Sequence, residues 1–108
     1  MSTTIEPANI FNAAESIAYA EKSVVSKTII KKTTGTVTIF SFDKGEGLSE
    51  HSAPHEALIQ LLDGTAEIII GGQPHNLVAG QSIILPANIP HAVKATERFK
   101  MLLTMIKG

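Results

Sequence analysis

From residue 24 onward, apolar side chains occur in short runs that turn-forming residues interrupt. The runs are rich in β-branched residues and are bounded by Gly, Pro, Asn or Asp, which is typical of β-strands. Strands are expected at residues 24–30, 36–42, 49–53, 57–62, 65–70, 75–78, 82–85, 91–95 and 99–106. Many short strands at this spacing, with no long amphipathic helix among them, predict an all-β sandwich or barrel.

Glycine-containing pairs of residues define two of the predicted turns. Asp63-Gly64 is interpreted as a turn that ends one strand and starts the next. Gly71-Gly72 is the clearest signal for a two-residue hairpin in the chain, because both positions tolerate a positive φ.

The residues ahead of the first strand carry a different pattern. Asn12 and Glu15 have the spacing of a helix start, which predicts a short helical turn over 13–19. The expected organisation is therefore a single domain, made of an N-terminal arm with a short helix, residues 1–23, and a β-barrel, residues 24–108.

Several predicted strands are apolar at both odd and even positions, which suits strands that are buried on both faces. The edge segment 24–34 is also apolar, and such an edge favours aggregation unless something covers it. We therefore expect a homodimer that pairs through 24–34 and buries the outward residues Leu58, Leu62 and Ile69. The alternative is that residues 1–23 fold back over this edge within one chain.

Composition excludes several classes of partner and chemistry. The 108 residues include 9 Lys and Arg and 10 Asp and Glu, a net charge of −1, and there is no basic block. Binding to nucleic acid or to a membrane surface is therefore not expected. The absence of Cys excludes disulfides and thiolate chemistry. With no apolar run near the ~20 residues of a membrane span and no signal-peptide pattern at the start, a cytoplasmic protein is expected.

The stretch from Gly45 to Gly64 resembles the first signature motif of the cupin family. In that motif a Gly is followed by His-x-His, then by Glu, and finally by a second Gly. Gly45, His51 and Gly64 stand in register, whereas Ala53 occupies the place of the second His and Ala57 that of the Glu.

The stretch from residue 80 to residue 95 resembles the second cupin motif. Gly80, Pro86 and His91 match it. Asn88 replaces a Gly, which keeps the turn because Asn tolerates the left-handed conformation, and Ala95 replaces the final Asn. The resemblance covers about residues 31–106 and implies an RmlC-like, conserved-barrel cupin: a small double-stranded β-helix, or jelly-roll barrel.

Strand alternation and this resemblance together predict the side chains that share the barrel interior. The expected ligand pocket consists of His51, Ala53, Ala57, Ile59, Leu61, His91, Met101 and Leu103. Imidazoles bind Zn, Fe, Mn or Ni, so the candidate ligands of a divalent transition metal are His51 and His91, with His55 as a further candidate. A pair of histidines hydrogen-bonded to water or to each other is the alternative, and the favoured interpretation of His55 is a solvated turn residue.

Two functions are compatible with these residues. The favoured hypothesis is a cupin barrel that binds a small, mostly apolar molecule near His51 and His91, with no catalysis assigned. It is favoured because the alanines at 53 and 57 remove two of the family's metal ligands and leave apolar space. The alternative is a metal-dependent cupin enzyme of the dioxygenase, isomerase or decarboxylase type with an incomplete histidine set.

Overall fold

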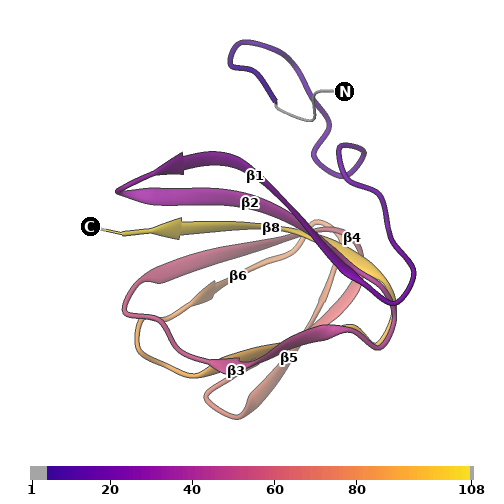
Figure 1. Ribbon diagram of the computed structural model, residues 1–108. Coiled ribbons are helices and arrows are strands. Elements are labelled where there is room, and N and C mark those ends of the chain that lie inside the picture. Colours follow the sequence, from indigo (N-terminus) through magenta and orange to yellow (C-terminus); the bar gives the residue numbers. More distant parts are fainter. Residues whose placement is uncertain (1–4, 108) are drawn as a thin grey trace.

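The computed structural model describes residues 5–107, which form eight β-strands and no helix (Figure 1). The strands are β1 (Val24–Lys32), β2 (Gly35–Phe42), β3 (Gly47–His51), β4 (Glu56–Ile70), β5 (Gln73–Val78), β6 (Ser82–Leu85), β7 (His91–Lys94) and β8 (Phe99–Ile106). The prediction of an all-β barrel is confirmed. Within the described residues, no helix is long and apolar enough to cross a membrane.

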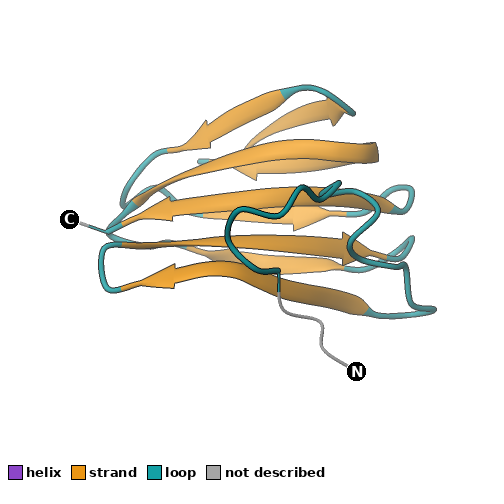
Figure 2. Cartoon of the chain, turned by 90° about the horizontal axis from the view of Figure 1, so that it is seen from above, coloured by secondary structure: helices purple, strands orange, loops and turns teal. Residues whose placement is uncertain are grey.

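The strands form two antiparallel sheets that share β4 (Figures 1 and 2). The first half of β4 pairs with β8 and β6, and β8 continues through β2 to β1, which completes the first sheet. The second half of β4 pairs with β5 and β7, and β7 pairs with β3, which completes the second sheet. The sheets face each other as the two walls of the barrel, and β1 and β3 are edge strands at the ends of the main strand path.

The prediction of two strands separated by a turn at Asp63-Gly64 is wrong, because β4 runs unbroken from Glu56 to Ile70. The strand bends at this point instead: its pairing with β8 is interrupted by a bulge between Leu61 and Asp63, and Gly64 has a φ of 77°. A β-carbon at position 64 would collide with the backbone carbonyl of Arg98. Glycine therefore lets the strand pass from one sheet into the other.

The predicted helical turn over 13–19 is also not formed as a helix. Asn12 does act as a cap, because its Oδ1 accepts a hydrogen bond from the backbone N–H of Glu15 at 3.1 Å. The backbone N–H of Ser16 bonds to the carbonyl of Asn12 at 3.0 Å, and the helical hydrogen bonding stops there. A single isolated turn is too short to be stable as a helix without further support.

Side chains of the first sheet donate hydrogen bonds to backbone carbonyl groups of the arm. In a helix, these carbonyl groups would accept from backbone N–H groups of the arm itself. Lys100 Nζ donates to the carbonyl of Ala14 at 2.6 Å, and Lys27 Nζ donates to the carbonyl of Ser16 at 3.2 Å. The Ser41 hydroxyl donates to the carbonyl of Ala18 at 2.9 Å. These hydrogen bonds hold the arm, as an irregular loop, over the outer face of the first sheet (Figure 2).

The core lies between the two sheets and includes a stacked pair of aromatic rings. Phe42 and Phe99, neighbours on β2 and β8, stack with their centroids 4.5 Å apart and an interplanar angle of 11°. The side chains of Ile59 and Ile68, from the two halves of β4, are completely buried in the same cluster. Gly71 and Gly72 have φ values of 56° and 81°, so the predicted hairpin between β4 and β5 is confirmed.

Candidate functional site

Two histidines lie side by side at one end of the barrel. His51 is the last residue of β3 and His91 is the first residue of β7, and the two are partners in the pairing of these strands. Their ring centroids are 4.5 Å apart, with an interplanar angle of 66°. Strand pairing therefore brings together residues that are 40 positions apart in the sequence, as the motif resemblance implied.

Backbone carbonyl groups orient both rings. Nδ1 of His51 lies 2.8 Å from the carbonyl oxygen of Ser49, and Nδ1 of His91 lies 3.3 Å from that of Ile89. A carbonyl oxygen only accepts, so Nδ1 carries the proton in each neutral ring and Nε2 keeps its lone pair. Within residues 5–107, neither Nε2 atom has a hydrogen-bond partner. The pair therefore offers two acceptors to whatever binds beside it.

His91 is held in the neutral form. Its side chain is nearly buried, with 9% of its surface exposed, and burial lowers its pKa below the ordinary value. The backbone hydrogen bond to Ile89 raises the pKa, and the neighbouring charge of His51 lowers it again. Because the lowering causes dominate, Nε2 of His91 remains an acceptor at neutral pH.

Both rings border a cavity of about 50 Å³ inside the barrel. Its polar side chains are all histidines: His51, His55 and His91. Its remaining lining is apolar and consists of Leu48, Ala53, Ala57, Ile59, Leu85, Val93, Met101, Leu103 and Met105. The methyl groups of the two alanines that replace family ligands thus form part of the wall.

The structure brings together all but one of the residues predicted to line a pocket. Leu61 is the exception, because it is buried farther along β4, opposite Met101, and does not line the cavity. The predicted pocket lacks four apolar residues that line the cavity: Leu48, Leu85, Val93 and Met105. Val93 could have been found, because it has the same strand parity as His91, and Leu48 is its partner on β3.

Two loops surround the entrance to this cavity. The backbone N–H of Asn88 donates to the carbonyl of Ala53 at 2.7 Å, which ties the loop after β6 to the loop after β3. Asn88 has a φ of 65°, so the prediction that it keeps a left-handed turn is confirmed. Beside the entrance lies an outer hollow of about 350 Å³, here called the mouth hollow, lined by Pro54, His55, Glu56, Ala87 and Ile106. His55 borders both spaces.

His75 lies away from this site. It is on β5, opposite Ile68, and its Nδ1 is 3.3 Å from the carbonyl oxygen of that residue. It lines neither the cavity nor the mouth hollow.

The side chains present do not provide a complete metal site. A catalytic metal is usually held by three protein ligands. Within residues 5–107, no group of three His, Cys, Asp or Glu side chains is placed so that it could hold a metal ion. His51 and His91 supply two imidazoles, and the positions that would complete the family's set carry the methyl groups of Ala53 and Ala57.

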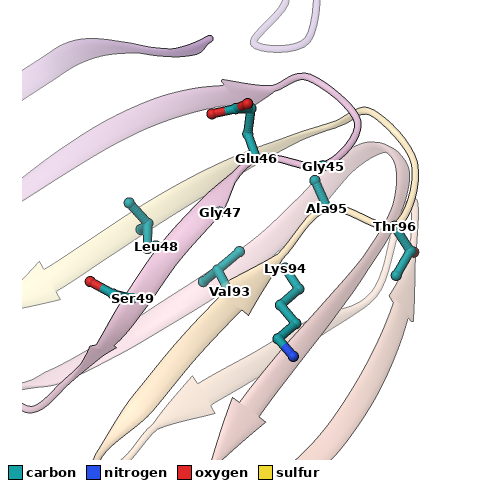
Figure 3. A pocket seen from close by; sticks show the side chains of 9 residues that line it. All are labelled: Gly45, Glu46, Gly47, Leu48, Ser49, Val93, Lys94, Ala95 and Thr96. Carbon is teal, nitrogen blue, oxygen red and sulfur yellow. The ribbon is translucent and has the colours of Figure 1, made fainter. Parts of the chain in front are cut away.

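A larger hollow of about 420 Å³, open to solvent, runs along β3 and β7 (Figure 3). Its residues are Gly45, Glu46, Gly47, Leu48, Ser49, Val93, Lys94, Ala95 and Thr96. Figure 3 shows the side chains of Glu46 and Lys94 pointing in opposite directions, so they form no common charged site. Leu48 and Val93 line both this hollow and the inner cavity, and so separate the two.

The cupin domain family matches residues 38–107, which is more than half of the chain, and the protein therefore belongs to the cupin family. Proteins of this family commonly bind metals.

Among solved structures, a conserved protein of unknown function from Streptococcus pyogenes is 35% identical, with a TM-score of 0.92. The likeness covers 97% of this chain and 92% of that one. A cupin 2 conserved barrel domain protein from Leptotrichia buccalis is 49% identical, with a TM-score of 0.87, over 90% of this chain and 47% of that one. A curated relative, protein SchB of Streptomyces halstedii, is 26% identical over 76 residues, 69% of this chain, and the chain spans only 55% of its length.

Proposed function

We propose that this cupin binds a small, mostly apolar molecule that carries a hydrogen-bond donor, and we assign no catalysis to it. The observation that supports this proposal is a cavity with an apolar wall whose polar groups are imidazoles. Apolar pockets with a few convergent polar groups are the usual form of a small-molecule site.

The volume limits the part of the ligand that enters. Ligand pockets usually measure about 300–1,000 Å³, and one water occupies about 30 Å³ of liquid. A cavity of about 50 Å³ therefore takes only a small apolar group. The mouth hollow of about 350 Å³ borders the same His55, and it has room for the rest of the molecule.

The acceptor atoms define the polar end of the ligand. Nδ1 of each ring faces a backbone carbonyl, so a neutral ring presents Nε2 as an acceptor. A hydroxyl group can donate to such an atom, whereas an ether or ester oxygen cannot. A short alcohol or a phenol therefore fits these groups better than a molecule without a donor.

Phenol is a suitable probe for this proposal, with binding followed by nuclear magnetic resonance of isotope-labelled protein. We expect shifts at the methyl groups of Ala53 and Ala57 and at the ring of His91, and none at His75, which serves as an internal control. Ala57→Leu should abolish the shifts by filling the cavity, and Ala79→Leu, in an exposed turn, should not. Shifts that persist in Ala57→Leu would overturn the proposal.

The alternative, a metal-dependent enzyme, rests on one observation, namely that three histidines border the same cavity, although within residues 5–107 no three such side chains are placed to hold an ion together. Elemental analysis of protein purified without added metal tests it. Bound metal at one equivalent that is lost in His51→Ala combined with His91→Ala would support this alternative over simple ligand binding. The cytoplasmic location expected from the sequence stays a prediction.

A further inference from the structure

The outer face of the first sheet is divided into a covered half and an uncovered half. On the covered half, the arm packs over Ile39 and Ser41, which are 0% and 1% exposed. On the other half, Ile106 is 68% exposed, Ile84 is 59% exposed and Ile30 is 49% exposed. Isoleucines this exposed on one sheet face form the kind of apolar patch that usually marks an interface.

Strand pairing arranges the uncovered half into two rows, here called the uncovered rows. Directly paired residues of neighbouring strands project from the same face of a sheet. The first row crosses β1, β2, β8, β4 and β6 and consists of Ile30, Val37, Thr104, Leu58 and Ile84. The second row lies at the end of the sheet and consists of Lys32, Gly35, Ile106 and Glu56.

The surface along these rows is grooved. One groove of about 200 Å³ lies over β4, β6 and β8, and another of about 210 Å³ lies over β1, β2 and β8. Both are bordered by Thr104 and Ile106, so they are adjacent along β8. Side chains of an opposing surface can fill such grooves.

The charges of the second row are complementary to those of a second copy of the same row. Lys32 lies at the β1 side and Glu56 at the β4 side, with the apolar Ile106 between them. A two-fold axis along β8 keeps each row opposite itself and reverses its direction. Lys32 of one copy is then offset sideways from Glu56 of the other by about one strand spacing, ~4.8 Å, across the gap of about 10 Å between packed sheets, which these two long side chains can bridge. An axis across the strands would instead place Lys32 opposite Lys32.

We propose that a second copy of this chain packs face to face on the uncovered rows, about a two-fold axis along β8. Ile30 of one copy would face Ile84 of the other across this contact. This arrangement differs from the pairing of edge strands expected from the sequence. It also leaves out Leu62, which lies at the bulge in β4 and belongs to neither row, and Ile69, which lies on the second sheet opposite Ala92.

The same contact completes the wall of the candidate ligand site. Glu56 and Ile106 line both the groove over β4 and the mouth hollow, and the mouth hollow borders His55. The second copy therefore stands beside the entrance and shields the hollow from solvent. This step rests on the proposed ligand binding, whereas the dimer itself does not.

Light scattering at micromolar to millimolar protein tests the dimer. The parent should have twice the chain mass of 11.5 kDa. Ile30→Lys should raise the dissociation constant by about tenfold or more, as expected for an anchor that becomes a buried charge. Val78→Lys is the matched control, because Val78 is equally exposed, at 49%, but lies on the second sheet. A monomeric parent, or equal weakening by both variants, would overturn the proposal.

A charge exchange tests the direction of the axis. Lys32→Glu and Glu56→Lys should each weaken the dimer by about two- to fivefold, the range of exposed ion pairs. The two substitutions together should restore the parent affinity, because positions 32 and 56 would again carry opposite charges facing each other across the contact. A double variant weaker than either single variant would contradict an axis along β8.

Phenol titration of the Ile30→Lys variant, at a concentration where light scattering finds the parent dimeric and the variant monomeric, tests the shared entrance. Ile30 lines neither the cavity nor the mouth hollow, so any loss of affinity reflects the missing copy. We expect phenol to bind at least about threefold more weakly, and unchanged affinity would show that the partner does not contribute to the site. Ala57→Leu should abolish phenol binding and keep the dimer mass, which separates failure of the ligand proposal from failure of the dimer.

Discussion

Along β8, the side chains that face the interior change from one end of the barrel to the other. Phe99 is completely buried against Phe42, whereas Leu103 and Met105 are only partly buried and line the cavity. The inward positions of β4 change in the same direction, from the larger side chain of Leu61 to the methyl group of Ala57. The same strands therefore provide a close-packed end, which stabilises the fold, and a looser end, which leaves space beside the histidines.

Truncating one residue at each end measures this difference directly. Phe99→Ala should lower the free energy of unfolding by about 3–5 kcal/mol, because it removes a fully buried ring from a close-packed cluster. Leu103→Ala should cost no more than about 2 kcal/mol, because its side chain is partly exposed and already borders a void. Urea unfolding measures both values. Equal losses would contradict the distinction between the two ends.

Restoring the missing ligands would turn the looser end, beside the histidines, into a metal site. Ala53→His combined with Ala57→Glu adds an imidazole and a carboxylate to a cavity that already has two imidazoles. Affinity for Zn²⁺ should rise by roughly a hundredfold or more over the parent, which is about 2.7 kcal/mol. Isothermal titration measures the affinity, and circular dichroism checks the fold. A folded double variant with the parent's affinity would show that these alanines do not stand at ligand positions.

The packed end and the general arrangement of strands were predictable from local pattern. Gly71-Gly72 and Asn88 have the positive φ values that their residue types allow, and Ala57 and Ile59 are inward as the cupin resemblance, extended by strand alternation, implied. In these cases the local chemistry of the residue and its environment in the fold agree.

The errors arise where distant pairing decides between local alternatives. Gly64 has the same positive φ in a bend as it would have in a turn, and only the pairing of β4 with β8 on one side and with β7 on the other distinguishes the two. The arm resembles a helix start, but side chains of Lys100 and Ser41 bind its carbonyl groups. Neither contact can be predicted from local sequence.

Enlarging one alanine at each end compares the space that is available there. Ala66→Leu, on the fully buried side of β4, should cost about 1–3 kcal/mol of stability because the added atoms must displace packed neighbours. Ala57→Leu should cost less than about 1 kcal/mol, because its added atoms enter a cavity of about 50 Å³. Urea unfolding gives both changes. An equal or larger cost for Ala57→Leu would indicate that the cavity cannot accept a ligand group.

The smallest expected effect is the pH dependence of stability, and it arises at the looser end of the barrel, where His91 lies. Burial lowers the pKa of His91 in the folded protein, so on acidification the unfolded chain takes up this proton first. The stability that His91 contributes is fully present above its unfolded pKa of about 6.5 and is lost as pH falls through the lower folded value. Urea unfolding between about pH 7 and pH 5 should therefore show a steeper loss of stability in the parent than in His91→Gln.

The matched variant His75→Gln, at a residue outside the cavity, should keep the parent's slope, because the slope depends on the proton uptake of His91 and not on overall stability. If His91→Gln and the parent lose stability in parallel, the neutral state assigned to His91, and with it the acceptor proposed for the ligand's donor, is wrong.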